Sequence, residues 1–236
     1  MSKPLLQVTD LQFAWPGQPT LLDIPAFSLQ AGERLFLKGP SGSGKTTLLG
    51  LLGGVHQPQR GEINLLGQSL GQLSALRRDR FRADHTGYLF QQFNLLPYLS
   101  VLDNVTLPCR FSSLRRERAL RQQPDLNTAA GHLLRELGLS DITLQQRSAN
   151  ALSIGQQQRV AAARALIGSP ELVIADEPTS ALDANSRDAF LKLLFDECAQ
   201  MGSSLLFVSH DTSLATRFDR ALSLAELNRA SQPETF

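Results

Sequence analysis

The segment GPSGSGKTT, residues 39–47, has residue types that suit the binding of a phosphate chain. Its three glycines allow the backbone to curl so that successive N–H groups converge on phosphate oxygens. Lys45 supplies a mobile positive charge for the outer phosphates, and Thr46 supplies a hydroxyl for Mg²⁺. Because the segment follows a predicted strand and opens a predicted helix, it fits the Walker A pattern in the required context. The sequence therefore predicts these phosphate-site residues: Gly39, Pro40, Ser41, Gly42, Ser43, Gly44, Lys45, Thr46 and Thr47.

Two adjacent carboxylates come at the end of the apolar run in LVIADEPTS. Asp176 is placed to hold Mg²⁺ through water, and Glu177 is placed to act as a general base on an attacking water. Adjacent carboxylates at a strand end are common by themselves. Beside a phosphate loop, they complete the parts that phosphoryl transfer needs: a phosphate cradle, a metal anchor and a base.

The segment LSIGQQQRVAAARAL, residues 152–166, joins a predicted helix to an unusual beginning. Ser, Gly and Gln predict a helix start that presents backbone N–H groups, yet the bulky β-branched Ile154 lies among them. The beginning is therefore either a structural N-cap or an altered copy of a ligand-binding turn. In the helix that follows, Val160, Ala163 and Ile167 lie along one face.

Strands and helices alternate through most of the chain. ERLFLKG, EINLLG, TGYLFQ, ELVIADEP, SSLLFVSHD and RALSLAEL predict strands, and helices are expected around residues 186–200 and 212–218. This alternation predicts an α/β fold whose buried strands are largely parallel. LLQVTDLQFAW and PAFSLQAGERLFL predict meander strands, which would give the fold an antiparallel start.

The middle of the chain, from about residue 100 to 139, predicts helices rather than strands. We interpret it as a helical subdomain inserted between two parts of the α/β core. The Arg-rich helix within it has two interpretations, a solvated face or a surface for a partner or lipid head groups. The arginines concerned are Arg110, Arg115, Arg116, Arg118 and Arg121.

The composition is that of a soluble globular protein, with 236 residues, 42% hydrophobic and 19% charged. The formal net charge of +1 gives no general case for nucleic acid or an anionic membrane as a partner. Cys109 and Cys198 lie far apart in the sequence and are expected to be thiols in a reducing compartment. The segment MSKPLLQVTD lacks the apolar region of a signal peptide, and the apolar runs are too short to span a bilayer. Any membrane role is therefore expected to come through a partner.

Taken together, these segments resemble the ATP-binding-cassette (ABC) ATPases, in the order of that family and over nearly the whole chain. GPSGSGKTT resembles Walker A, LVIADEPTS resembles Walker B, and LSIGQ resembles the signature that is normally LSGGQ. LFQQFNLLP resembles the Q-loop, SALD the D-loop, FVSHD the switch segment and FAWPG the A-loop.

The resemblance implies an α/β fold: a P-loop NTPase core of the ABC ATPase type with an N-terminal antiparallel β subdomain and an inserted α-helical subdomain. It implies a single ABC ATPase domain over residues 1–236. The nucleotide-binding core would comprise about 1–92 and 166–236. The helical subdomain with the signature motif would comprise about 93–165.

The resemblance also implies roles for particular residues. Gln91 would sense Mg²⁺ and the attacking water, and His210 would contact the γ-phosphate. Trp15 would stack on adenine, with Phe13 as the alternative aromatic residue. The implied catalytic residues are Glu177, His210 and Gln91, and the implied metal ligands are Thr46, Gln91 and Asp176. The implied nucleotide contacts outside Walker A are Trp15, Ser153, Gly155, Gln156 and Asp183.

GYLFQQFNLLPYLSVLDNVTLP and GLLGGVHQPQRGEI are similar to the lipoprotein-release and macrolide-export ATPases of bacteria. This resemblance implies an ATPase, using ATP and Mg²⁺, that powers a separate permease at the cytoplasmic face of the inner or plasma membrane. It also implies a head-to-tail dimer with two ATP molecules held between Walker A of one copy and Ser153 and Gly155 of the other. The alternatives are the ATPase of an importer of amino acids or other small solutes, and a soluble ABC protein that acts on DNA or ribosomes. No nucleic-acid partner is expected.

Overall fold

The structure, a computed structural model, describes residues 3–230. The chain folds as two compact units. The first holds residues up to Arg82 and from Leu206 onward, and the second holds Ala83–Leu205. The chain passes between the units along α2 (Ala75–His85) and β8 (Ser204–Ser209).

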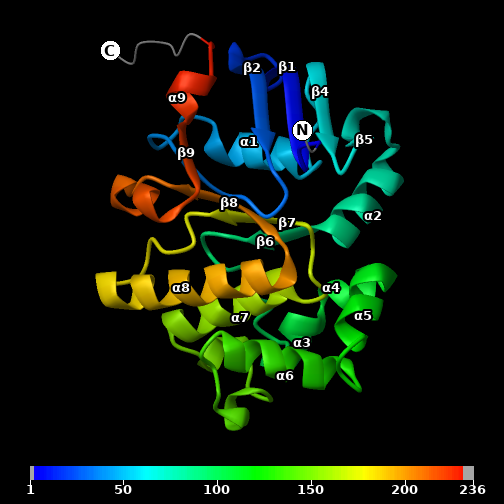
Figure 1. The fold of residues 1–236 in the computed structure, drawn as a ribbon, viewed down its shortest axis with the longest axis vertical. Coiled ribbons are helices and arrows are strands. Elements are labelled where there is room, and N and C mark those ends of the chain that lie inside the picture. The colour runs from blue at the N-terminus through cyan, green and yellow to red at the C-terminus, as the bar shows by residue number, and fades with distance from the viewer. Residues whose placement is uncertain (1–2, 231–236) are drawn as a thin grey trace. The chain divides into compact units, whose positions relative to one another are not determined.

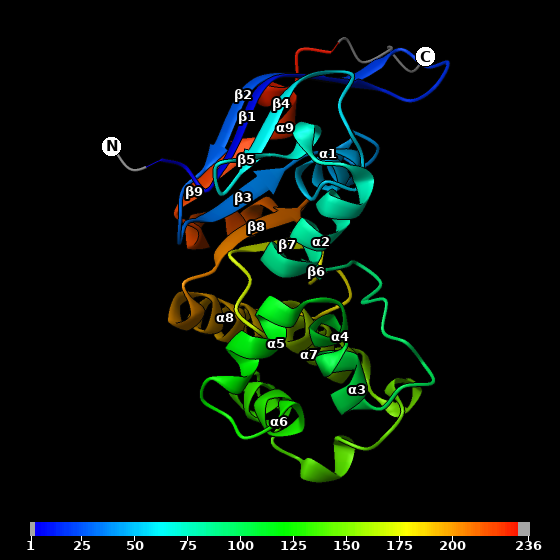
Figure 2. The ribbon, with the colours of Figure 1, turned by 90° about the vertical axis from the view of Figure 1, so that its right-hand side faces the viewer.

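An antiparallel sheet in the first unit has the strand order β2-β1-β4-β5. In Figures 1 and 2, β1 lies between β2 and β4. Leu6 of β1 is opposite Leu29 of β2 and Leu65 of β4. Leu6 and Val8 are buried, and so are Leu11 and Phe13, with the alternation interrupted by the register shift between Thr9 and Gln12. This burial is expected for a sheet with one covered face. The predicted antiparallel start is confirmed for β1 (Leu6–Ala14) and β2 (Thr20–Leu29). The sheet also contains β4 (Arg60–Leu65) and β5 (Gln68–Ser69), so EINLLG pairs antiparallel and not, as the sequence predicts, with the largely parallel strands.

The strand β3 (Arg34–Lys38) corrects one part of that prediction, because it does not continue the meander. It pairs in parallel with β9 (Arg220–Ser223), with Leu35 opposite Arg220. Leu35, Phe36 and Leu37 are all fully buried. A strand that is buried on both faces belongs in a parallel, covered sheet rather than in a meander with one solvated face.

The remaining elements of the first unit are short. The helix α1 (Lys45–Leu52) follows β3, and α9 (Leu224–Leu227) follows β9. The segment expected to be a helix around 212–218 forms a 3₁₀ helix, η4 (Thr212–Arg217), and a further 3₁₀ turn, η1 (Leu70–Gln72), follows β5.

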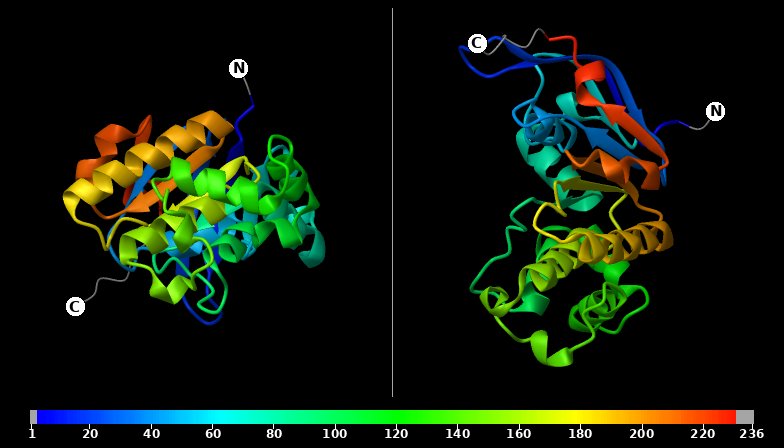
Figure 3. Two further views of the ribbon diagram at one scale, coloured as in Figure 1. Left: turned by 90° about the horizontal axis from the view of Figure 1, so that it is seen from below. Right: turned by 90° about the vertical axis from the view of Figure 1, so that its left-hand side faces the viewer.

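The second unit joins a parallel strand pair to a group of helices. Thr86 of β6 (Thr86–Leu89) is opposite Leu172 of β7 (Leu172–Asp176). The helix α7 packs against α3, α6 and α8, and Figure 3 shows α7 and α8 side by side. The predicted helical middle, from about residue 100 to 139, is confirmed, because α3 to α6 lie in it. The helices are α3 (Val101–Thr106), α4 (Pro108–Phe111), α5 (Ser113–Leu120), α6 (Leu126–Glu136), α7 (Ile154–Leu166) and α8 (Ala184–Met201), with η2 (Ile142–Leu144) and η3 (Ala149–Ala151).

The prediction of a solvated arginine face is wrong for Arg115, which is only 2% exposed. Its guanidinium donates hydrogen bonds of 2.7 to 3.2 Å to the backbone oxygens of Arg164, Ala165 and Ile167. The last carbonyls of a helix have no partner within the helix, so Arg115 completes the C-terminal end of α7. Burial lowers the pKa of Arg115 to about 10, which leaves it charged at neutral pH.

The other arginines of this group differ in exposure. Arg118 is half-buried, and it donates to the Ser169 carbonyl and the Glu171 carboxylate. Three of the five are exposed, as predicted: Arg110, Arg116 and Arg121.

Cys109 and Cys198 are buried, and neither forms a disulfide within residues 3–230. Burial raises the pKa of the Cys109 thiol. Across residues 3–230, every helix is too short or too polar to cross a membrane.

Candidate nucleotide-binding site

The loop between β3 and α1 has the backbone geometry of a phosphate cradle. Gly42 and Gly44 have φ angles of 76° and 91°, which L side chains rarely adopt. Gly39 is required for its small size instead, because a Cβ there would lie 2.9 Å from Oγ of Ser43. The loop therefore depends on all three predicted glycines, two for conformation and one for space.

Lys45 is the first residue of α1, and its side chain folds back over this loop. Its Nζ donates to the carbonyl oxygens of Gly39 and Pro40, both at 2.8 Å, and Oγ of Ser43 donates to Pro40 at the same distance. These bonds hold the loop in one shape and place an ammonium group at a helix N-terminus. The helix dipole and the backbone N–H groups favour an anion at that position. Thr46 and Ser41 are exposed beside it.

Trp15 and Phe13, the two aromatic candidates for an adenine contact, differ in exposure. Trp15 is 37% exposed, whereas Phe13 is 6% exposed. The Trp15 ring meets Phe13 edge-on at 5.1 Å and His56 edge-on at 5.2 Å, so both neighbours support it. His56 in turn donates its backbone N–H to the Gly50 carbonyl in α1. Trp15 therefore retains ring surface for a ligand, and Phe13 buttresses it.

His210 is exposed directly after β8. The next residue, Asp211, donates its backbone N–H to Oγ of Ser209 and accepts from the Ser213 N–H with its side chain. This capped turn fixes the backbone at the end of β8, where His210 lies.

In the second unit, Asp176 ends β7 and Glu177 starts a sharp turn. Glu177 has a φ of 44°, a left-handed conformation that costs about 1–2 kcal/mol for a residue with a Cβ. The Ser180 N–H closes the turn on the Glu177 carbonyl at 3.3 Å. Nε2 of the buried Gln158 holds the Pro178 carbonyl at 2.8 Å. Backbone strain of this kind is typical of functional sites, where the surrounding contacts maintain it.

Gln91 is exposed two residues beyond β6, and the chain after it turns sharply. Phe93 and Asn94 have φ angles of 59° and 48°. The guanidinium of Arg164 in α7 donates to both of their carbonyl oxygens, at 2.6 Å to that of Asn94. Burial lowers the pKa of Arg164 to about 10, so it remains a charged donor at neutral pH. One buried arginine thus fixes the turn that follows Gln91.

The start of α7 is a complete N-cap. Oγ of Ser153 accepts from the Gln156 N–H at 3.3 Å, and Oε1 of Gln156 accepts from the Ser153 N–H at 2.9 Å, which is a capping box. Ile154 is the first helical residue, with its φ outside the positive range and its side chain 55% exposed. Ile154 therefore lies in ordinary helical backbone without strain.

The backbone conformation at Gly155 does not require glycine. Its φ is not positive, and within residues 3–230 an added Cβ would meet only Nη1 of Arg159, at an ordinary 3.5 Å. Asp183 caps α8 by accepting from the Ser186 N–H at 2.9 Å, and this hydrogen bond lowers the pKa of the Asp183 carboxyl.

The sequence interpretation missed two supporting residues, Gln158 and Arg164. Both lie on the buried side of α7 among alanines. A Gln and an Arg in such a position were the available indication that buried carbonyls required donors.

Comparison with known proteins gives a consistent result. The family model described as "ABC transporter" matches residues 22–180. The chain is 39% identical over 199 residues to the lipoprotein-releasing system ATP-binding protein LolD 1 of Rhodospirillum rubrum, covering 84% of each chain. It is 37% identical over 230 residues to the macrolide export ATP-binding/permease protein MacB 2 of Aeromonas hydrophila, covering 96% of this chain and 34% of that one.

A solved structure with the same fold is the dimeric, post-hydrolysis state of the ATP-binding cassette MJ0796 bound to ADP and Pi. The similarity has a TM-score of 0.77 at 30% identity and covers 98% of this chain and 100% of the other.

Proposed function

We propose, from the premise that this chain belongs to the ABC transporter family, that it powers a separate membrane permease of the lipoprotein-release or macrolide-export type. The chain is the ATP-binding subunit of an ABC transporter and an ATPase. The observation that carries the proposed permease type is the similarity to LolD 1, which extends over 84% of both chains. That relative is named as the ATP-binding protein of a lipoprotein-releasing system, which suits a cassette that works with a permease.

The phosphate loop, residues 39–47, binds ATP, the substrate of this ATPase. Lys45 would bind the outer phosphates from the N-terminus of α1, and Trp15 would stack on the adenine. We assign Mg²⁺ to Thr46, Asp176 and Gln91, because hydroxyl, carboxylate and amide oxygens are the donors that this ion prefers. In the described residues, no three His, Cys, Asp or Glu side chains form a metal cluster. The three assigned protein ligands suit a Mg²⁺ ion that is held largely by phosphates and water. The ion would neutralise phosphate charge there.

The proposed hydrolytic step uses three side chains. Glu177 accepts a proton from the water that attacks the γ-phosphorus, which leaves ADP and inorganic phosphate as products. His210 donates a hydrogen bond to the γ-phosphate, and Gln91 orients the attacking water. The capped and strained turns that carry these residues restrict their backbone positions, as positioning of a nucleophile requires.

The signature turn would act on the nucleotide of a second copy. Gly155 destabilises a helix by about 0.5–1 kcal/mol relative to Ala, and the described chain gives no steric reason for it. Close approach of another molecule to the N-terminus of α7 would supply that reason. We therefore infer a head-to-tail dimer with ATP between Walker A of one copy and Ser153, Gly155 and Gln156 of the other. Asp183 would lie beside the same contact.

The proposed domain division has a nucleotide-binding core at about 1–92 and 166–236 and a helical subdomain at about 93–165. The proposed site of action is the cytoplasmic face of the inner or plasma membrane, with attachment through the permease. Dimer closure and reopening would move the helical subdomains and so do mechanical work on the permease.

Purification of the tagged chain from detergent-treated native membranes tests the permease assignment. We expect a permease with a large extracytoplasmic domain to co-purify and to raise the ATPase rate. A parallel purification with Glu177→Gln and ATP should retain the same partner. Recovery of ribosomes or nucleic acid in its place would refute the proposal, and a permease that works with a solute-binding protein would favour an importer.

Ile154→Gly tests whether this residue impairs the signature turn. We expect the wild type to be active with its permease, and the variant to raise turnover by no more than about tenfold, because the Ile154 backbone already supplies its N–H. Urea denaturation should show a loss of about 0.5–1 kcal/mol, since glycine weakens a helix. Ile154→Ala serves as the control that removes the side chain without freeing the backbone. Undetectable wild-type activity that glycine restores would contradict this expectation.

A further inference from the structure

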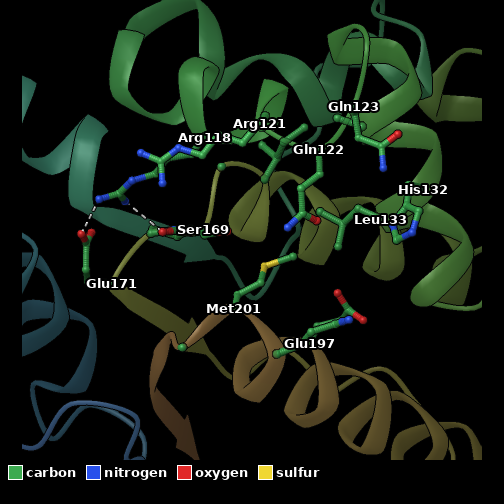
Figure 4. Close-up of a pocket in the computed structure, with 17 residues that line it drawn as sticks. Arg118, Arg121, Gln122, Gln123, His132, Leu133, Ser169, Glu171, Glu197 and Met201 are labelled. Carbon is green, nitrogen blue, oxygen red and sulfur yellow. Dashed lines mark hydrogen bonds and ion pairs between the residues drawn. The ribbon is translucent and has the colours of Figure 1, made fainter.

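A cavity of ≈ 560 Å³ lies within the second unit, and none of the residues assigned above to nucleotide lines it. It is bounded by the end of α5, residues 121–123, α6, residues 167–171 and the end of α8 (Figure 4). Cavities of this size accommodate small organic molecules. The chemistry of its walls decides which class of molecule it suits.

Glu197 of α8 is the unusual group in this cavity. As a whole residue it is 5% exposed, and no hydrogen bond or ion pair joins its carboxylate to another residue between 3 and 230. Its oxygens are not among the fully buried polar atoms that lack a partner, so they still meet solvent in the cavity. Figure 4 shows the side chain directed into the cavity, on the same side as Met201. Burial raises the pKa of Glu197, and the neighbouring Glu136 and Asp196 raise it further. The carboxylate therefore faces the cavity without a protein donor, and a ligand cation is the kind of partner that it can accept.

The other acid that lines the cavity, Glu171, is half-buried and already has partners. His85 and Arg118 lie 2.9 and 2.7 Å from its two carboxylate oxygens. Burial alone would raise the pKa of Glu171, but these hydrogen bonds outweigh it and bring the pKa to about 2. Arg118 also donates to the Ser169 carbonyl, so its guanidinium is held beside Glu171 and Ser169. Glu197 is therefore the acid that remains for a ligand.

We propose that this cavity binds an organic cation, a primary ammonium or guanidinium group on an aliphatic chain, with its charged head on Glu197. Leu133 and Met201 line the cavity beside Glu197 and would cover the aliphatic chain, while amide side chains at its rim would bind further polar atoms. The volume far exceeds that of a bare metal ion, and the described residues contain no cluster of three metal-ligating side chains. Such a cation would come either as a free amine or as a Lys or Arg side chain of another protein.

The affinity of the cavity for a cation should fall as the pH is lowered. The cation requires the ionised carboxylate, so affinity is present above the pKa of Glu197 and is lost as pH falls through it. Because that pKa is raised, the loss should begin at a higher pH than for an ordinary glutamate. The other titratable and charged groups around the cavity are Arg118, Arg121, His132, Glu136, Glu171 and Asp196.

The test is calorimetric titration of the full chain with two probes, cadaverine as a free amine and Nα-acetyl-lysine methylamide as a presented lysine. We expect one site with a Kd below about 1 mM for at least one probe. Glu197→Gln should weaken binding by at least about tenfold. Glu117→Gln is the control, because Glu117 is an exposed acid that does not line the cavity, and it should change the affinity by less than about twofold.

Carbon NMR of the Glu197 carboxyl in the wild-type chain gives a second readout that requires no variant. A saturating probe should lower the pKa of Glu197. Tighter binding of cadaverine assigns the site to a free amine, and tighter binding of the lysine probe assigns it to a protein side chain. Equal binding by wild type and Glu197→Gln, or a Glu197 resonance that ignores both probes, would overturn the proposal. Neither readout uses ATP, so the result is independent of the proposed transport function.

Discussion

Glu177→Gln is expected to abolish ATP turnover while leaving ATP binding intact. An amide does not accept the proton of the attacking water, and loss of a general base lowers turnover by about 10²–10⁴-fold. Gln has the same shape and the same Cβ, so the turn with φ of 44° at this position should persist. Phosphate release measures the loss, and binding of a fluorescent ATP analogue measures what is retained.

The same variant should accumulate the ATP-bound dimer, because closure occurs and reopening requires hydrolysis. Light scattering should therefore show ATP-dependent dimers for Glu177→Gln and mainly monomers without ATP. Glu117→Gln, an exposed site on α5, is the matched control and should behave as wild type. Normal turnover in Glu177→Gln would refute the assignment of the base.

Arg115→Met is expected to give the largest loss of stability among these variants. It removes donors to three carbonyl groups at the end of α7, at 2.7 to 3.2 Å, and leaves those buried oxygens unpaired. Breaking a buried charged contact of this kind lowers the free energy of unfolding by about 3–5 kcal/mol. Urea denaturation followed by circular dichroism measures the change.

Arg116→Met is the control for this result, since Arg116 is the next residue along α5 and is exposed. We expect it to change the free energy of unfolding by less than about 0.5 kcal/mol. Equal effects of the two substitutions would mean that the charge of the helix, rather than the contacts of Arg115, sets the stability.

Much of the fold could be predicted because it depends on neighbours in sequence. The antiparallel start is visible in the alternation of β1, and the buried runs of β3 and β7 are visible as short apolar segments bounded by Gly or Asp. The α/β fold expected for a P-loop ATPase is confirmed by the solved cassette with the same fold. The partner of β3 was not predictable in this way, because Leu35 pairs with Arg220, far along the chain.

The amino-acid sequence by itself determined the local parts of the candidate site. Two glycines fix the phosphate loop, Ser153 and Gln156 fix the start of α7, and each effect acts within a few residues. LSIGQ could therefore be read as a helix start in which Ile154 keeps a helical backbone.

Only the tertiary structure decided which charged side chains are buried and which groups they contact. Arg115 binds a carbonyl 52 positions away, and Arg164 binds one 70 positions away. An arginine on a polar helix looks the same in sequence whether it meets water or a buried carbonyl. The same is true of Glu197, whose burial without a partner arises from α6 and the end of α8 lining one cavity. Burial depends on which distant segments pack together, and local periodicity does not carry that information.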